Sequence, residues 1–379
     1  MLCRAKAMRT ALRSRRQASE AAGRLPEESH RDFLNAGFYR ILQPRCYGGY
    51  EFSIPDFVRL LLEVSRGCTD SGWVLSLLAA QPASILCLFP EQAQREVYAE
   101  SGDARVAAVI APGGNATVTT DGFRLSGQWD YCTGCDIATH FLGSAVLLHP
   151  LTGAPYGTAC VLIDREQFSI VDNWNMFGMQ GTGSRRVVVE SVTIPAHRVL
   201  PFSGDQWRAP GPQPGYEIHQ NPLYRGSPLT VAEFALHSVA VGTARGALDA
   251  FEDTLRKKWN LPPYPPRFEM PEFQHAFGTA RALIDTAEAA LLRLAEYIPH
   301  SPDDARRTLR AAAHCMEMAW QATDLMFRSA GSSSGHQHST LGHCFRGLAV
   351  LRTHLGAQYD HKSLNVARLH FGLPPTNTL

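Results

Sequence analysis

The middle of the chain alternates apolar and polar residues with a period of two. One such run covers 122–132 and a second covers 187–193, and apolar runs occur at 141–148 and 158–163. The alternating apolar residues of the first run are Phe123, Leu125, Trp129 and Tyr131. Successive side chains of a strand point to opposite faces, so this alternation predicts strands with one buried face. Residues 105–205 are therefore predicted to form a β domain.

Helical spacing replaces this alternation before residue 105. Three prolines in this region are each followed by an acidic residue. They are Pro26, Pro55 and Pro90. This order suits a first helical turn, because proline lacks only a donor that is free there and acids favour the positive end of the helix dipole. Residues 1–104 are predicted to form a helical domain. Its start, Met1–Arg16, has six Arg or Lys and no acid, and we interpret it as a solvated basic arm leading into a helix.

Four long helical segments are predicted in the C-terminal part, 206–379. They cover 230–258, 271–297, 302–330 and 342–370. Their lengths and the short gaps between them predict an antiparallel four-helix bundle. The stretch 201–228, rich in proline and glycine and without periodicity, is predicted to be an exposed linker. The whole pattern indicates a mostly helical α+β protein in the order helices, strands, helices.

Composition narrows the possible classes of function. The chain has 379 residues, with 36 basic against 35 acidic side chains, so nothing indicates binding to nucleic acid or to an anionic membrane surface. No apolar run approaches the roughly 20 residues that a membrane span needs. Nine cysteines, an odd number scattered along the chain, favour reduced thiols and a cytoplasmic location.

Two loops of small residues follow or precede the alternating runs. Gly127–Asp136 ends in a turn around Gly134, where Thr133 and Cys135 are expected to present polar groups to a planar ligand. The second loop, Gly181–Ser184, leads into the run at 187–193. It lacks the lysine and the strand-to-helix context of a nucleotide-binding P-loop.

The motifs Gly127–Asp136 and Trp174–Ser184, with the upstream sequence Pro44–Glu51, resemble the acyl-CoA dehydrogenase fold. More narrowly, the chain resembles the oxygenase components of two-component flavin-dependent monooxygenases of the p-hydroxyphenylacetate hydroxylase type. The resemblance extends from about Leu25 to Leu379. It implies an N-terminal helical domain, a central β-barrel or sandwich domain and a C-terminal four-helix bundle, with boundaries that we set at 1–104, 105–205 and 206–379.

The resemblance also implies an activity. A separate flavin reductase would supply reduced FMN or FAD, which reacts with O2 to a C4a-hydroperoxide that hydroxylates carbon or nitrogen of a small substrate, either aromatic or a secondary metabolite. The enzyme would be a homotetramer, with no nucleic-acid or membrane partner.

Six residues match the family's cofactor positions. They are Trp73, Tyr131, Thr133, Ser184, Arg256 and Gly331. By the resemblance, Tyr131 and Thr133 give an aromatic wall and a hydroxyl near flavin N5, while Arg256 and Gly331 serve the cofactor phosphates of a neighbouring subunit. The family has a second glycine beside Gly331, which this chain lacks, so FMN and FAD both stay open. Structural alternatives are a simple turn at Thr133, a core indole at Trp73 and a dipole-opposing charge at Arg256.

The resemblance assigns catalysis to His354. Relatives carry an Arg-Asp pair seven residues before this histidine, and here the pair reads Arg346-Gly347. An imidazole with its ordinary pKa of about 6.5 would hold a phenolate or donate a proton near neutrality. Relatives also have a substrate-contacting histidine where this chain has Gln81. Glutamine hydrogen-bonds but takes no proton at neutral pH, so Gln81 and His354 are the predicted substrate residues and a substrate other than a simple phenol is expected.

Two other functions stay open. An acyl-CoA dehydrogenase needs a carboxylate base, and the matching place reads Tyr359-Asp360, with a shorter side chain than the family's glutamate. The third possibility is a paralogue without activity that uses the bundle for assembly.

Two clusters suggest metal or redox chemistry without further support. Cys132 and Cys135 have the spacing of a dithiol motif, but they lie at a strand end with no second pair. His336, His338 and His343 lie near small residues in a connector. We therefore predict no metal site.

Overall fold

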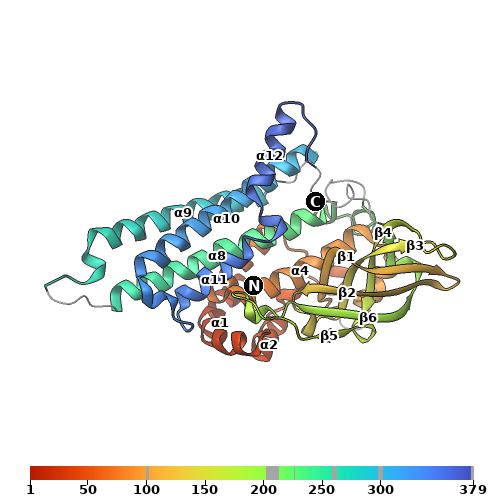
Figure 1. Cartoon of the computed structure of the whole chain (residues 1–379), viewed down its shortest axis with the longest axis horizontal. Helices are drawn as coiled ribbons and strands as arrows, with labels where there is room; N and C mark the ends of the chain where they lie inside the picture. Colours follow the sequence, from red (N-terminus) through yellow and green to blue (C-terminus); the bar gives the residue numbers. More distant parts are fainter. Residues whose placement is uncertain (100–101, 202–212, 226, 258–262, 298–301, 377–379) are drawn as a thin grey trace.

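The chain forms an elongated molecule with a sheet at one end, a helical bundle at the other and the N-terminal helices between them (Figure 1). A computed structural model describes residues 1–99, 102–201, 213–225, 227–257, 263–297 and 302–376. The order helices, strands, helices and the mostly helical α+β class are confirmed. Because the predicted boundary between 205 and 206 lies outside the described residues, the division into three domains stays a prediction.

Five α-helices precede the sheet in the described part of the chain. They are α1 (Leu2–Ala22), α2 (Glu27–Ala36), α3 (Ile54–Gly67), α4 (Thr69–Leu88) and α5 (Glu91–Tyr98). The prediction of a solvated arm at Met1–Arg16 is wrong, because this segment belongs to α1 and packs against α3. Ala5 and Leu12 lie on one face of that helix and are buried. The basic residues do not prevent α1 from packing against α3, because most of them lie on other faces of α1 than Ala5 and Leu12.

Helix α4 contradicts the expectation that no segment has the length and apolar character of a membrane span. Among the described residues it is the one helix that is long and apolar enough, with a mean hydropathy of 1.5 over its 18-residue window, and 94% of that window is buried inside the protein. It contacts α3, α8 and strand β1. Its apolar character is therefore explained by its position as a central core helix.

The sheet has seven strands in the order β5-β6-β2-β1-β3-β4-β7. They are β1 (Val106–Thr119), β2 (Gly122–Cys132), β3 (His140–Leu148), β4 (Pro155–Asp164), β5 (Ser169–Val171), β6 (Arg185–Ile194) and β7 (Val199–Pro201). All neighbours are antiparallel except β1 and β3. The alternation in β2 buries Leu125 and Trp129, and the Trp129 indole donates to the carbonyl of Ser144 at 2.8 Å.

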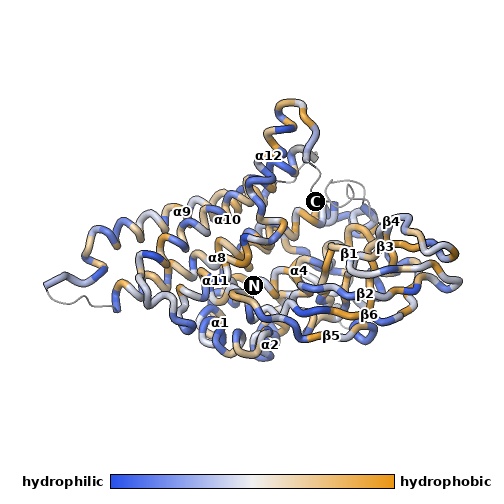
Figure 2. The backbone as a smooth tube through the Cα atoms, viewed as in Figure 1, coloured by the Kyte–Doolittle hydropathy of each residue, from blue (hydrophilic) through white to orange (hydrophobic). Residues whose placement is uncertain are grey.

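The C-terminal bundle consists of α8 (Pro228–Lys257), α9 (Pro271–Ala295), α10 (Pro302–Ala330) and α11 (Thr340–Leu351). Figure 2 shows hydrophobic residues along α8 and through the sheet, in agreement with the buried clusters there. The single helix predicted over 342–370 is wrong. It breaks at a 3-10 turn, Leu355–Ala357, after which α12 (Tyr359–His370) projects from the bundle (Figure 1). His354 caps that turn by accepting a hydrogen bond from the Gly356 amide.

The predicted exposed linker at 201–228 lies partly outside the described residues, because 202–212 and 226 are not described. Its described part is ordered and includes α7 (Pro214–His219). Tyr224 is fully buried, and its hydroxyl donates to the carbonyl of Leu42 at 3.1 Å. For this part the prediction of an exposed linker is wrong, because one buried aromatic residue fixes a segment that has no periodicity.

Candidate active site

Three of the predicted residues meet through hydrogen bonds where α4, the end of β2 and the start of β6 come together. The Trp73 indole N–H donates to the Thr133 hydroxyl at 3.2 Å. The Thr133 and Ser184 hydroxyl oxygens lie 2.8 Å apart, and those of Ser184 and Thr182 are also 2.8 Å apart. All four side chains are buried, with Trp73 the most exposed at 7%.

The pairing of β2 with β6 explains why Thr133 and Ser184 are neighbours. The two strands are antiparallel, and Cys132 lies opposite Arg185. One step further along each strand brings Thr133 opposite Ser184. The two small-residue loops predicted from the sequence therefore form one structure. Gly134 completes it with a left-handed φ of 70°, and an added Cβ there would lie 2.9 Å from Leu78 of α4.

The hydroxyl chain has a defined direction. The Thr182 hydroxyl donates to the carbonyl of Met179 at 2.8 Å, so its oxygen accepts from Ser184. Since each hydroxyl has one proton, Ser184 in turn accepts from Thr133, and Thr133 accepts from Trp73. Met179 has a left-handed φ of 59° although it is not glycine, a conformation that costs roughly 1–3 kcal/mol and is enriched at functional sites.

Tyr131 lies outside this buried chain. Its side chain is 65% exposed, its φ is 63°, and its ring meets that of Trp174 edge-on, with centroids 5.8 Å apart. The Trp174 indole donates to the same Met179 carbonyl at 3.0 Å. Trp174 lies in the sequence motif Trp174–Ser184 but is not among the predicted site residues. Nothing in the motif distinguishes it from Met176 or Phe177.

His354 is linked to this buried hydrogen-bonded chain by its contact with Trp73. The two rings are in edge-on contact, with centroids 5.6 Å apart. Thr133 and His354 therefore contact the same indole. His354 lies in the break between α11 and α12, where its Nδ1 accepts from the Gly356 amide at 3.1 Å. An accepting Nδ1 leaves the proton of the neutral ring on Nε2.

The ordinary pKa expected for His354 is wrong. His354 belongs to the exposed residues, but desolvation by the surrounding protein and, to a smaller extent, the positive charge of Lys362 together lower its pKa to about 4. Lys362 forms an ion pair with Glu233 of α8. His354 is thus a neutral N–H donor near pH 7, and it does not act there as a cation.

Two ionisable residues beside His354 were missed by sequence reasoning. Glu233 lies on α8, and His237, one turn later, is fully buried with its Nε2 4.0 Å from the Glu233 carboxylate. Desolvation, Lys362 and His354 lower the pKa of His237 well below its usual value, so its ring is neutral. No local pattern distinguishes His237 from the other histidines of the chain.

Gln81 is buried on α4. It follows Trp73 by eight residues, and because residues four apart lie on one helix face, the two side chains share a face of α4. This placement is compatible with the predicted substrate role. It does not by itself test that role.

Arg256 and Gly331 do not join the other predicted residues within one chain. Arg256, near the end of α8, is exposed and forms an ion pair with Glu252 at 2.9 Å. Gly331 follows α10 with a left-handed φ of 81°. The ends of α8 and α10, which these residues adjoin in sequence, lie at the end of the bundle that is remote from the sheet (Figure 1).

The residues that suggested redox or metal chemistry have other partners. Cys132 and Cys135 are buried free thiols, and burial raises the pKa of Cys135 to about 12. His343 takes part in an ion-pair network with Glu20. Within the described residues, no group of three or more His, Cys, Asp or Glu side chains is arranged to hold a metal ion.

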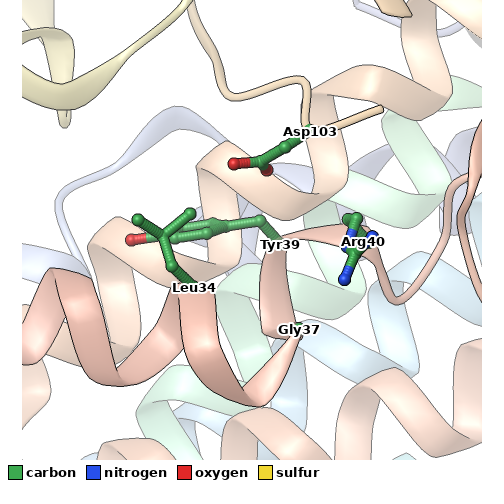
Figure 3. Close-up of a pocket in the computed structure, with 5 residues that line it drawn as sticks. All are labelled: Leu34, Gly37, Tyr39, Arg40 and Asp103. Atoms are coloured by element: carbon green, nitrogen blue, oxygen red, sulfur yellow. The ribbon is translucent and has the colours of Figure 1, made fainter. Parts of the chain in front are cut away.

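Two cavities in the described part of the molecule are lined by none of the predicted site residues. One of about 280 Å³ is lined by Leu34, Gly37, Tyr39, Arg40 and Asp103 (Figure 3). The other, of about 350 Å³, is lined by Trp320, Ala349, Arg352 and Thr353, next to His354 in sequence. The predicted flavin pocket coincides with neither, and it stays a prediction supported by the contacts of Trp73.

Comparisons with known proteins agree with this architecture. The family model "Acyl-CoA dehydrogenase, C-terminal domain" matches residues 234–359. The oxygenase subunit HsaA of a flavin-dependent monooxygenase from Rhodococcus jostii is 30% identical over 97% of this chain and 97% of its own length. The oxygenase component of an FADH2-dependent resorcinol hydroxylase from a Rhizobium strain is 28% identical over 96% of this chain and 92% of its own.

A solved structure supports the same assignment. The crystal structure of 3-HSA hydroxylase from Rhodococcus sp. RHA1 has a TM-score of 0.89 and 28% sequence identity, and the similarity covers 99% of this chain and 97% of that one. The predicted acyl-CoA dehydrogenase-like fold and the resemblance to monooxygenases are thus confirmed. On these grounds the chain belongs to the oxygenase components of two-component flavin-dependent monooxygenases, and it is a hydroxylase built on the acyl-CoA dehydrogenase fold.

Proposed function

We propose that this enzyme binds reduced FMN or FAD from a separate flavin reductase and uses O2 to hydroxylate a small aromatic substrate. The observation that carries the proposal is the buried hydrogen-bonded chain from Trp73 through Thr133 to Ser184. A relative that is an FADH2-dependent resorcinol hydroxylase supports both the cofactor and the aromatic class of substrate. The acyl-CoA dehydrogenase alternative has less support, because Asp360 is an exposed residue in the first turn of α12.

The polar groups fit the ring edge of a reduced flavin. The protons of Thr133 and Ser184 are used within the hydroxyl chain, but the Thr133 oxygen has a second lone pair. A reduced flavin carries N–H donors along its ring edge, so Thr133 suits it as an acceptor. Trp73 and Tyr131 offer apolar ring surface, as a planar ligand requires. When bound, the reduced flavin supplies the electrons that activate O2.

His354 and Gln81 are proposed to hold the substrate. Both side chains are placed relative to Trp73, one by ring contact and the other by helix spacing. His354 presents a neutral Nε2–H, because its Nδ1 accepts from a backbone amide and its pKa is low. This group donates to an oxygen of the substrate without bringing a positive charge. Gln81 adds hydrogen bonds but exchanges no proton at neutral pH.

Replacing Thr133 with valine tests the cofactor site. Thr133→Val keeps the shape of the side chain but leaves the buried Trp73 N–H without its partner. We expect reduced flavin to bind about tenfold more weakly, since an unmade buried hydrogen bond costs roughly 1–3 kcal/mol. The measurement is an anaerobic titration with reduced FMN and reduced FAD, which also decides between the two cofactors.

The matched control for this experiment is Thr323→Val. Thr323 is fully buried in α10, and its hydroxyl has no hydrogen-bond partner among the residues that the structure describes. The same change there should leave flavin affinity as in the wild type. Equal affinity of Thr133→Val and the wild type would remove Thr133 from the cofactor site.

We propose further that the enzyme is a homotetramer in which Arg256 and Gly331 serve the cofactor of a neighbouring subunit. Arg256 is near the end of α8 and Gly331 follows α10. These helix ends lie at the end of the bundle remote from the sheet (Figure 1), and this supports the proposal, because Thr133 and Ser184 adjoin strands of that sheet. The exposed guanidinium of Arg256 matches a phosphate in charge and geometry. A cytoplasmic location is compatible with nine free cysteines, seven of them buried.

Replacing Arg256 with alanine tests whether this residue contacts the cofactor of a neighbouring subunit. Arg256→Ala should weaken reduced-flavin binding by about tenfold, as expected for one charge-assisted hydrogen bond, without changing the subunit number in light scattering. Arg281→Ala is the control, because Arg281 is equally exposed and pairs with Asp285 on α9. A monomeric wild type with tight flavin binding would contradict the proposal.

A further inference from the structure

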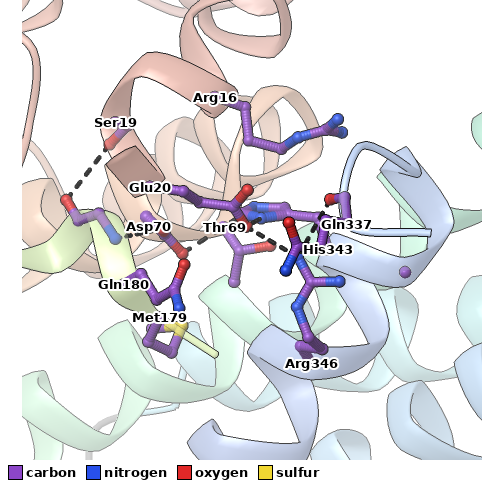
Figure 4. Close-up of polar contacts among 12 residues, drawn as sticks. Arg16, Ser19, Glu20, Thr69, Asp70, Met179, Gln180, Gln337, His343 and Arg346 are labelled. Carbon is purple, nitrogen blue, oxygen red and sulfur yellow. Dashed lines mark hydrogen bonds and ion pairs between the residues drawn. The ribbon is translucent and has the colours of Figure 1, made fainter. Parts of the chain in front are cut away.

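A buried carboxylate anchors the loop that carries Thr182 and Ser184. Asp70, at the start of α4, has no exposed surface, and its Oδ2 accepts from the Gly181 amide at 2.8 Å (Figure 4). A Cβ at Gly181 would lie 2.7 Å from that oxygen and 2.1 Å from the Ser19 hydroxyl of α1. The loop backbone therefore touches α1 and α4 directly, at a distance that only glycine permits.

A second ion-pair layer balances the charge of Asp70. The His343 Nε2 of α11 lies 3.9 Å from Asp70 Oδ1, and its Nδ1 is 2.7 Å from the Glu20 carboxylate of α1. Arg346, one turn after His343, reaches the same Glu20 oxygen at 3.0 Å. Figure 4 shows these side chains converging between α1, α4 and α11. A buried carboxylate is costly unless it is paired, so His343 makes the ionised form of Asp70 possible.

The contacts of Asp70 and Trp73 close a ring of contacts that begins and ends on α4. Trp73 follows Asp70 by three residues on α4, so one helix end holds both. From Asp70 the connection runs through Gly181 to Thr182 and Ser184, then through Thr133 to the Trp73 indole and back to α4. Removing the Asp70 contact opens this ring at the loop while the Trp73 and Thr133 contact stays in place.

We propose that Asp70, balanced by His343, is a positioning residue that holds the Gly181–Ser184 loop so that its hydroxyls order Thr133 toward the flavin. This inference rests on the proposed function in one respect only, namely that Thr133 lies at the cofactor. The anchoring of the loop by Asp70 is a property of the protein without flavin, and it is testable in that form.

The experiment compares Asp70→Asn with Asp249→Asn. Asp249 also joins α1 to the bundle by ion pairs, with Arg66 at 2.7 Å and Arg13 at 3.1 Å, but it does not contact the loop. Amide hydrogen exchange of flavin-free protein is followed by mass spectrometry in peptides that span 179–187. Asp70→Asn should accelerate exchange there by about tenfold or more, since a charge-assisted hydrogen bond is lost, whereas Asp249→Asn should not.

Two functional readouts follow the same variants. Asp70→Asn should weaken reduced-flavin binding by about tenfold, as for loss of a single buried hydrogen bond, and should release more H2O2 per reduced flavin oxidised. Asp249→Asn should lower the urea midpoint without either change. A double variant, Asp70→Asn with His343→Gln, should bind reduced flavin no more weakly than Asp70→Asn alone, because His343 influences the loop through Asp70.

Gly181→Ala gives an independent route should Asp70→Asn fold poorly. It keeps every charge but forces the loop away from Ser19 and Asp70, so it should reproduce the faster exchange and weaker binding. The proposal would be overturned if amide exchange at 179–187 in Asp70→Asn or Gly181→Ala were as slow as in the wild type. It would also be overturned if Asp249→Asn accelerated this exchange as much as Asp70→Asn does. If the loop is released but wild-type protein binds no reduced flavin, the proposed function fails and the anchoring stands.

Discussion

His354→Ala should lower the yield of hydroxylated product per reduced flavin oxidised by about 100-fold, the lower end of what a positioned proton donor contributes. The reason is that His354 is the neutral N–H donor in contact with Trp73, and alanine leaves the substrate oxygen without that donor. Reduced-flavin affinity should change by less than about twofold, because no hydrogen bond to Thr133 or Ser184 is removed. Product and H2O2 are measured together, and their sum accounts for the flavin oxidised.

The control is His314→Ala. His314 is an exposed histidine of α10 whose ring contacts Tyr359 at the start of α12, with centroids 5.0 Å apart. The two variants thus remove the same side chain and a comparable ring contact. Because the pKa of His354 is about 4, the wild-type yield should also show no inflection near pH 6.5 from this residue. Equal yields of His354→Ala and the wild type would end its catalytic assignment.

Local periodicity was sufficient for most helices and strands but not for the surfaces that they bury. The start of α1 carries many positive charges, and only tertiary contacts show that Ala5 and Leu12 lie against α3. The break before α12 depends on the capping of Gly356 by His354. A helical pattern continues on both sides of this break, so periodicity alone does not place it.

The candidate site shows the same division. Thr133 and Ser184 could be predicted as residues of two loops that each adjoin a strand, and in the structure the register of β2 and β6 brings them together. The network of Asp70 and His343 could not, since its members come from helices far apart in sequence. His343 appeared in the sequence only as one of several histidines near small residues. Buried charge compensation is a long-range property that no short motif encodes.

The stability of the enzyme should fall as the pH rises from about 6.5 to about 10, and His343 should account for most of that slope. Desolvation works to lower the pKa of His343, but the charge of Asp70, a hydrogen bond to Cys68 and the hydrogen bond to Glu20 raise it to about 10. A histidine whose folded pKa is raised contributes full stability below its unfolded pKa. That contribution falls as the pH rises above the unfolded pKa, because the unfolded ring loses its proton while the native ring keeps it, and it is gone above the folded pKa.

The size of this effect follows from the same shift. With about 1.4 kcal/mol for each unit between the usual 6.5 and about 10, loss of the His343 proton removes on the order of 5 kcal/mol. Glu20 and Arg346, which form the ion-pair network with His343, keep their charge in this window. His343 and Arg346 together lower the pKa of Glu20 against the effect of its burial, and Arg346 stays cationic. Burial raises the pKa of the Asp70 carboxyl, and the charge of His343 opposes this by favouring the ionised form.

The slope of stability against pH is measured from urea midpoints at about pH 7, 8.5 and 10, which cover the window between the two pKa values. His343→Gln should be less stable than the wild type at pH 7 and nearly independent of pH above it, because glutamine does not titrate. His30→Gln is the control. His30 is buried, hydrogen-bonds the Tyr39 hydroxyl at 3.0 Å, and has a pKa lowered by desolvation and by Arg105. Since its ring is neutral above pH 7 in either state, this variant should retain the wild-type slope. An unchanged slope in His343→Gln would show that the charge of His343 is not what holds α1, α4 and α11 around Asp70.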